Sequence, residues 1–198
     1  MLVPGLPYRR VVESGLVMAV DELAALVDRW RVPTVPSAAL GGPAHVTVLY
    51  PWVDAPVATS DLDRLEVQLA DVRPMTLRFD RLERFPSGVL YLALDAPSEQ
   101  RCRSLASLVG SAFPSCIPYN NEHPDPTPHL TIAMSDDDAV LDRITSEVGE
   151  ALAPSLPYVA TIPQLTVMTQ APDQRWHRTH HVPLLGDAST APRGTQSH

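Results

Sequence analysis

The sequence predicts an α+β fold built on an internal duplication, and three observations lead to this prediction. The pattern His-x-Thr occurs twice, in the apolar, strand-like runs Ala44–Tyr50 and Pro128–Met134. Its two histidines are 84 positions apart (45 to 129), which is close to half of the 198-residue chain. Around each run the expected order is helix, His-x-Thr strand, helix and strand hairpin, so the second half repeats the element types of the first.

The first half of the chain is predicted to alternate strands and helices. Residues 15–20 form a short apolar strand, and Asp21 follows as the N-cap of a helix with apolar residues at helical spacing. Residues 32–43 contain three prolines and two glycines, which predicts a loop before the first His-x-Thr strand. Ser60 is a suitable N-cap for a second helix that continues to about residue 72.

A strand hairpin is predicted in the middle of the chain. Residues 75–85 and 89–95 have strand character and are joined by the turn Pro86-Ser87-Gly88. Ser98 is predicted to cap a third helix that ends near residue 113. A loop rich in proline and asparagine then leads into the second His-x-Thr strand.

The last third of the chain contains one helix and a closing pair of strands. Ser135 and three aspartates are expected to open a fourth helix, since negative charge stabilises a helix N-terminus. Residues 157–169 and 175–184 are expected to form the closing strand pair. The polar tail 187–198 is predicted to be disordered, which leaves residues 1–186 as a single bilobal domain.

Composition and charge exclude several classes of function. The formal net charge is −8 and the chain has no lysine, so we expect no binding of long nucleic acid, which depends on dense positive charge. The two cysteines are too few for a secreted disulfide framework. Neither a signal peptide nor an apolar run of the roughly 18 residues typical of a membrane span is recognisable. We therefore expect a cytoplasmic protein without membrane contact.

The two His-x-Thr pairs indicate acid–base chemistry on a phosphate. Alternation in a strand puts His45 beside Thr47, and His129 beside Thr131, on one face, while apolar neighbours point to the other. Two histidines around one ligand can divide the work, one as base and one as acid, because imidazole titrates near neutral pH. The threonine hydroxyls can donate to the non-bridging oxygens of a phosphate. These groups suffice for phosphodiester chemistry without a metal or other cofactor.

These residues resemble the two-histidine (2H) phosphoesterase superfamily, and in particular its bacterial RNA 2′,3′-cyclic phosphodiesterases, also called 2′-5′ RNA ligases. The resemblance covers about residues 15–186. Beyond the two motifs it is carried by Gly41–Pro51, Phe85–Leu92, Pro118-Tyr119 before the second motif, and Trp176–Leu184. Many members have a positively charged residue close to the second motif, whereas residues 135–138 of this chain are acidic apart from Ser135.

The resemblance implies a bilobal, pseudo-symmetric fold, in which each lobe is an antiparallel sheet flanked by helices and the lobes meet at a central cleft. It also implies opening of a 2′,3′-cyclic phosphate on an RNA end or a small nucleotide, with the reverse 2′-5′ ligation open to the same groups. His45 and His129 would be the catalytic acid and base, with His45 favoured as the acid. Thr47 and Thr131 would bind the phosphate. A monomer is expected.

Four further residues are possible contacts of the substrate. Tyr119 lies in the loop before the second motif, Trp52 follows the first motif, and Arg84 could supply positive charge. His177 belongs to a histidine-rich segment, 177–181, that also suggests a zinc site. The segment has no evident carboxylate or thiolate partner at a known spacing, so we predict no metal.

Three alternatives remain beside cyclic phosphodiesterase activity. The protein could bind a nucleotide or RNA end at a catalytically inactive 2H site, although both His-x-Thr pairs are intact. It could also hydrolyse another cyclic phosphate, such as an ADP-ribose cyclic phosphate. The histidine-rich segment leaves a metal hydrolase as a third possibility.

Overall fold

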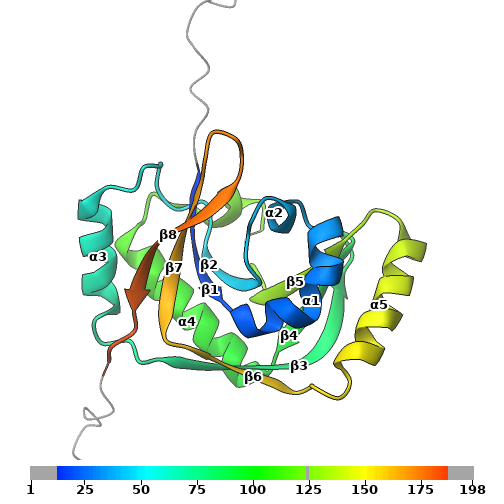
Figure 1. Cartoon of the computed structure of the whole chain (residues 1–198). Helices are drawn as coiled ribbons and strands as arrows, with labels where there is room; N and C mark the ends of the chain where they lie inside the picture. Colours follow the sequence, from blue (N-terminus) through cyan, green and yellow to red (C-terminus); the bar gives the residue numbers. More distant parts are fainter. Residues whose placement is uncertain (1–12, 124, 187–198) are drawn as a thin grey trace, which may run out of the picture.

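Two antiparallel sheets form the centre of the protein (Figure 1). The computed structural model describes residues 13–123 and 125–186, so the predicted disordered tail lies outside the described residues. The first sheet has the order β2-β1-β7-β8 and the second the order β5-β4-β3-β6. Their strands are β1 (Ser14–Ala19), β2 (His45–Leu49), β7 (Gln164–Gln170) and β8 (Trp176–Pro183), and β3 (Met75–Phe85), β4 (Val89–Leu94), β5 (His129–Met134) and β6 (Tyr158–Ile162). The predicted α+β class with two antiparallel sheets is confirmed.

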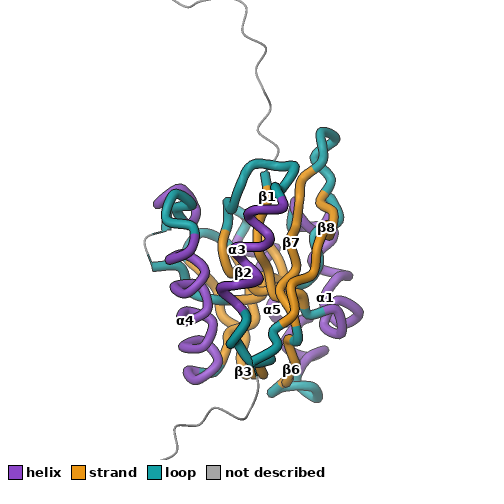
Figure 2. Tube along the Cα trace, turned by 90° about the vertical axis from the view of Figure 1, so that its left-hand side faces the viewer, coloured by secondary structure: helices purple, strands orange, loops and turns teal. Residues whose placement is uncertain are grey.

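Each sheet is flanked by helices that also reach the other sheet. The helices are α1 (Asp21–Thr34), α2 (Pro36–Ala39), α3 (Thr59–Leu69), α4 (Ala96–Ala112) and α5 (Asp138–Leu152), with a 3-10 turn, η1, at Pro118–Asn121. The connection β1-α1-β2 belongs to the first sheet, yet α1 packs against β5 of the second. Likewise α4, which connects β4 to β5, packs against β2. In Figure 2 α4 and α1 lie on opposite sides of the strands.

The two His-x-Thr strands occupy equivalent places. Each is the edge strand of its sheet, and β2 and β5 contact each other where the sheets meet. In both strands the histidine and threonine are half-buried, whereas the residue between them, Val46 or Leu130, is fully buried. The predicted alternation is therefore present in both strands, and it directs the polar pairs of both sheets toward the junction between them.

The sheets do not follow the two halves of the sequence. Residues 157–169, predicted as one strand, form β6 and β7 on either side of Pro163. β6 pairs with β3 in the second sheet, and β7 pairs with β1 and β8 in the first. Proline cannot donate to a strand ladder, so Pro163 ends one pairing as the chain crosses to the other sheet. The first sheet thus combines the N-terminal and C-terminal strands.

The prediction of a loop over residues 32–43 is wrong for its first part. α1 continues through Pro33 to Thr34, and α2 begins at Pro36. A proline in the last turn of a helix removes only one backbone hydrogen bond, and the hydroxyl of Thr34 donates to the carbonyl of Trp30 at 2.6 Å. Pro36 occupies the first turn of α2, where a missing N–H costs little.

Three predicted N-caps lie inside their helices. Asp21 is the first residue of α1, and Ser60 is the second residue of α3, which ends at Leu69 rather than near residue 72. The cap of α4 is Asp95, whose carboxylate accepts from the backbone N–H of Ser98 at 2.8 Å. The aspartates after the second motif do open α5, since Asp137 is its N-cap.

Candidate functional site

The two motif histidines are anchored in the same way, each by the backbone carbonyl two residues before it. Nδ1–H of His45 donates to the carbonyl of Pro43, and Nδ1–H of His129 donates to that of Thr127, both at 2.7 Å. A carbonyl oxygen only accepts, so each ring carries its hydrogen on Nδ1. Nε2 is then a base in the neutral ring and an acid in the protonated ring. Either histidine can take or give a proton at Nε2.

Burial keeps both imidazoles neutral at pH 7. It lowers the pKa of His45 from its usual 6.5 to about 4, although the hydrogen bond to Pro43 acts in the opposite direction. The positive charges of Arg31 and Arg178 lower this pKa further. Burial also lowers the pKa of His129, again against its own backbone hydrogen bond. The larger shift is that of His45, so His129 is the first of the two to be protonated as the pH falls.

Two aromatic rings of the second sheet enclose the imidazole of His129. Phe85 of β3 stacks on Tyr91 of β4 with ring centroids 4.1 Å apart. Both rings meet His129 edge-on, at centroid distances of 5.0 and 5.1 Å. The hydroxyl of Tyr91 donates to the carboxylate of Glu83 at 2.7 Å, which holds the tyrosine in place. The stacked pair therefore fixes the orientation of the His129 ring in addition to its Nδ1 hydrogen bond.

Arg31 of α1 connects the two half-sites, and its side chain is only 2 % exposed. Its Nε–H donates to the carbonyl of Thr131 at 3.0 Å, within the second motif. One terminal nitrogen donates at 2.8 Å to the carbonyl of Pro43, the same oxygen that accepts from His45. The other terminal nitrogen pairs with Asp28 at 2.6 Å. A buried positive charge thus ties β5 to the residue that orients His45.

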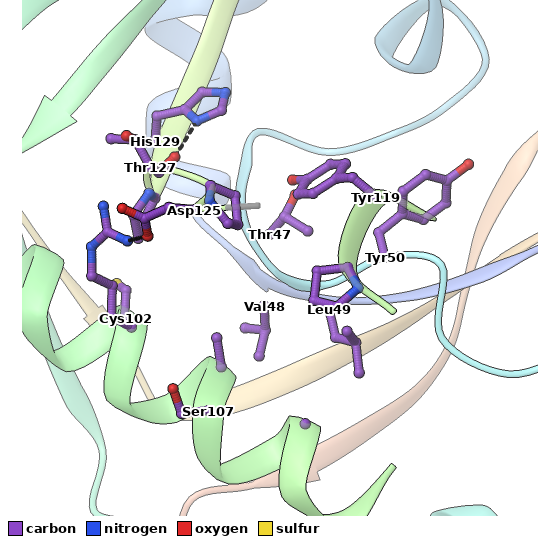
Figure 3. Close-up of a pocket in the computed structure, with 16 residues that line it drawn as sticks. Thr47, Val48, Leu49, Tyr50, Cys102, Ser107, Tyr119, Asp125, Thr127 and His129 are labelled. Atoms are coloured by element: carbon purple, nitrogen blue, oxygen red, sulfur yellow. Dashed lines mark hydrogen bonds and ion pairs between the residues drawn. The ribbon is translucent and has the colours of Figure 1, made fainter. Parts of the chain in front are cut away.

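Tyr119 lies beside Thr47 of the first motif (Figure 3). The two side chains are hydrogen-bonded, and burial raises the pKa of the Tyr119 hydroxyl. The backbone N–H of Tyr119 donates to the carbonyl of Tyr50 at 2.6 Å. Tyr119 has a φ of +48°, a conformation that non-glycine residues adopt only where the surrounding structure holds it. Of the four possible substrate contacts predicted from the sequence, Tyr119 is the one that lines the same cavity as the motif residues.

The four motif residues line one cavity of about 590 Å³, together with Arg31 and Tyr119. A smaller chamber of about 310 Å³ adjoins it between β2 and α4 on the His129 side, and we call it the Ser107 chamber (Figure 3). A second chamber of about 340 Å³ adjoins it on the His45 side, and we call it the Trp176 chamber. Thr47 lines all three spaces. The size of the central cavity suits a small-molecule ligand.

Trp52 and Arg84 lie outside this cavity. Trp52 is 4 % exposed and packs edge-on against Phe113 in the core, with ring centroids 5.2 Å apart. Arg84 forms ion pairs with Asp138 and Asp142 of α5. Asp138 is one of the aspartates that follow the second motif, so these acidic residues cap α5 and pair with Arg84.

His177 also lies away from the motif residues. It is exposed and pairs with Thr169 in the register of β7 and β8. Alternation puts its side chain on the face of β8 opposite to that of Trp176, which lines the Trp176 chamber. Among residues 13–123 and 125–186, no group of three or more histidine, cysteine or acidic side chains is arranged to hold a metal ion. In the same part of the chain, none of the helices combines the length and apolar character needed to cross a membrane.

Sequence reasoning missed three residues around the histidines. Phe85 and Tyr91 belong to the predicted hairpin, and only their cross-strand positions reveal that they enclose His129. Arg31 looks like one more charged residue of an amphipathic helix. A signal was present, because Arg31 lies four residues after Val27 and eight after Leu23, which puts it on the apolar face of α1.

Two sheets that each bring one His-x-Thr strand to a shared cavity define the 2H phosphoesterase class. The family model of the 2′-5′ RNA ligase superfamily matches residues 19–174 of this chain. The chain belongs to this superfamily, which comprises phosphoesterases and RNA ligases. The resemblance inferred from the two motifs is therefore confirmed.

Solved structures show the same fold. Escherichia coli LigT complexed with 3′-AMP is 15 % identical to this chain, with a TM-score of 0.54 over 88 % of this chain and 98 % of LigT. The protein TT0787 of Thermus thermophilus is 14 % identical, with a TM-score of 0.54 over 88 % of this chain and 99 % of that one. A search of curated proteins found no match.

Proposed function

We propose that the protein is a metal-independent phosphodiesterase that opens the 2′,3′-cyclic phosphate of an RNA end or a small nucleotide. The observation that supports this most directly is the matched anchoring of His45 and His129, which gives two imidazoles with free Nε2 atoms at one cavity. Solved structures of LigT include complexes with 3′-AMP, ATP and NADP+, which supports a small nucleotide as the ligand class.

In the proposed reaction one neutral histidine takes a proton from water as the water oxygen bonds to phosphorus. The bond from phosphorus to one ribose oxygen breaks, and the other, protonated histidine gives that oxygen its proton. The order of the pKa values favours His45 as the base and His129 as the acid. This is the reverse of the division favoured from the sequence, and its physical basis is the desolvation of His45 together with the nearby positive charges of Arg31 and Arg178. A ribose hydroxyl in place of water would give ligation with the same groups.

Three side chains would stabilise the phosphate. Thr47 and Thr131 line the cavity beside the histidines and can donate to non-bridging oxygens. Arg31 supplies a positive charge next to the second motif, where the following residues are acidic. Since one chain provides both half-sites, we propose that it acts as a monomer, and we retain the cytoplasm as its location.

The test is turnover of the four 2′,3′-cyclic nucleoside monophosphates in EDTA by the wild type and by His45→Ala and His129→Ala. We expect metal-independent turnover in the wild type and a loss of about 10²-fold or more in each variant, the usual size of an acid or base contribution. His180→Ala, an exposed histidine of β8, is the matched control and should keep full activity.

Other outcomes identify the alternatives. A folded protein that binds 3′-AMP without any turnover indicates an inactive binding site. Turnover of an ADP-ribose cyclic phosphate but of none of the four nucleotides indicates a different cyclic substrate. Activity that EDTA abolishes and zinc restores contradicts the proposed mechanism.

A further inference from the structure

The Trp176 chamber is built by one face of the first sheet. Its lining alternates along three strands: Glu13, Gly15 and Val17 at β1, Met168 and Gln170 on β7, and Trp176 on β8. The registers Gly15↔Met168 and Gln170↔Trp176 put these side chains on a common face. Val17 pairs with Thr47 of the first motif, so this face is continuous with the position of the catalytic pair. The opposite wall comes from residues 36–43 around α2.

Two aromatic rings and a thioether line this chamber on the side of the sheet, those of Tyr50, Trp176 and Met168. Trp176 and Tyr50 meet edge to face with ring centroids 6.1 Å apart. Tyr50 lies over Gly15, where a Cβ atom would come within 3.2 Å of the tyrosine ring. Met168 is buried beneath them. Flat rings and polarisable sulfur favour a planar heteroaromatic ligand.

Two polar residues, Glu13 and Gln170, line the end of the chamber away from His45. Glu13 accepts a hydrogen bond from the hydroxyl of Tyr50. The side-chain nitrogen of Gln170 donates to the carbonyl of Gln174 at 3.2 Å, which directs its donor out of the ligand's reach. Carboxylate and amide oxygens accept hydrogen bonds, and the negative charge of Glu13 disfavours a second phosphate here. The chamber therefore suits an uncharged ring with N–H groups on its edge.

We infer that the Trp176 chamber binds the base of the nucleotide whose phosphate lies between His45 and His129. This inference rests on the proposed function and adds the base as a recognised part of the substrate. The chamber opens at His45 and Thr47, so a base held there is joined to the reacting phosphate through a single ribose. The Ser107 chamber is less suited, because Arg103 and Asp125 line it as an ion pair.

The experiment compares the dissociation constants of adenosine 3′-monophosphate and of ribose 3-phosphate, which lacks the base, by calorimetry on the full chain. In the wild type the nucleotide should bind at least about tenfold more tightly, in line with typical base–aromatic stacking. Trp176→Ala should remove most of this difference and leave ribose 3-phosphate binding unchanged. Trp176→Phe keeps a stacking ring and should therefore retain most of the difference between the two dissociation constants. This result would also show that a substitution at position 176 leaves β8 folded.

Gly110→Leu is the matched control for the other chamber. A Cβ at Gly110 meets no atom within 4 Å, and Gly110 lines the Ser107 chamber, so a side chain at this position would narrow that chamber. We expect it to leave both dissociation constants unchanged. Loss of the base-dependent difference in Gly110→Leu but not in Trp176→Ala overturns the inference, as does equal binding of the two ligands by the wild type. If neither ligand binds, the proposed function itself is wrong.

Discussion

At the scale of single residues, the site depends on groups that hold the histidines as much as on the histidines themselves. Pro43 and Thr127 contribute only their carbonyl oxygens, yet these oxygens decide which ring nitrogen is free. Arg31 shares the Pro43 oxygen with His45 and also reaches Thr131, 100 positions further along the chain. Sequence patterns predict the motif histidines and threonines, because these residues repeat. They do not predict Arg31, because its role depends on hydrogen bonds to two backbone segments that are far apart in the sequence.

Arg31→Met should destabilise the protein by about 2–4 kcal/mol, because it removes the buried side chain whose charged hydrogen bonds reach the carbonyls of Thr131 and Pro43. Arg29→Met on the same helix is the matched control. Arg29 is exposed and stacks over the Trp30 ring at 3.7 Å, so its loss should cost less than about 1 kcal/mol. Urea unfolding measures the change in the free energy of unfolding for both variants. Equal stabilities of the two variants would contradict the bridging role of Arg31.

The buried imidazole of His45 should also make stability depend on pH. Its pKa is about 4 in the folded protein and near 6.5 when unfolded, so between these values the unfolded chain binds a proton that the folded one does not. Stability is full above pH 6.5 and falls as the pH drops toward 4. We expect the wild type to lose about 2 kcal/mol more than His45→Gln between about pH 7 and 4.5. If urea unfolding shows that the wild type and His45→Gln lose the same free energy of unfolding over this pH range, His45 is not the cause of the pH dependence.

At the scale of elements, strands were easier to predict than helix ends. The hairpin of β3 and β4 has a turn tripeptide between two apolar runs, and its bounds were predicted to within one residue. The N-terminus of α4 was placed too late, because Ser98 resembles a cap but Asp95 is the residue that accepts the hydrogen bond. Ser98 is instead buried and accepts from the backbone N–H of Arg78 at 3.0 Å.

One helix offers a direct gain in stability. Gly149 lies inside α5, and a Cβ there would meet Leu82 at 3.9 Å, an ordinary van der Waals distance. Gly149→Ala should therefore stabilise the protein by about 0.5–1 kcal/mol, since glycine loses more backbone entropy in a helix than alanine does. Thermal unfolding should show a higher midpoint. Gly88→Ala is the opposite case, because its φ is +79° and a Cβ would clash with Ser135, and it should lower the midpoint.

At the scale of the whole molecule, local patterns predict the two polar strands but not how the sheets are assembled. The motif spacing and element order indicate a duplication, and the resemblance supplies two antiparallel sheets. Which strands share a sheet depends on contacts far apart in sequence, such as β1 with β7 and β3 with β6. The packing of α1 on β5 and of α4 on β2 is equally long-range, and it brings Arg31 to the second motif.

The strand order also fixes when the parts of the site can be completed during synthesis on the ribosome. All four strands of the second sheet lie between residues 75 and 162, so that sheet can be completed first. The first sheet contains the earliest strand, β1, but it must wait for β7 and β8. A nascent chain that has emerged only through β6 already carries both His-x-Thr strands. It still lacks Met168, Gln170 and Trp176, so the Trp176 chamber is the last part of the cavity to acquire its walls.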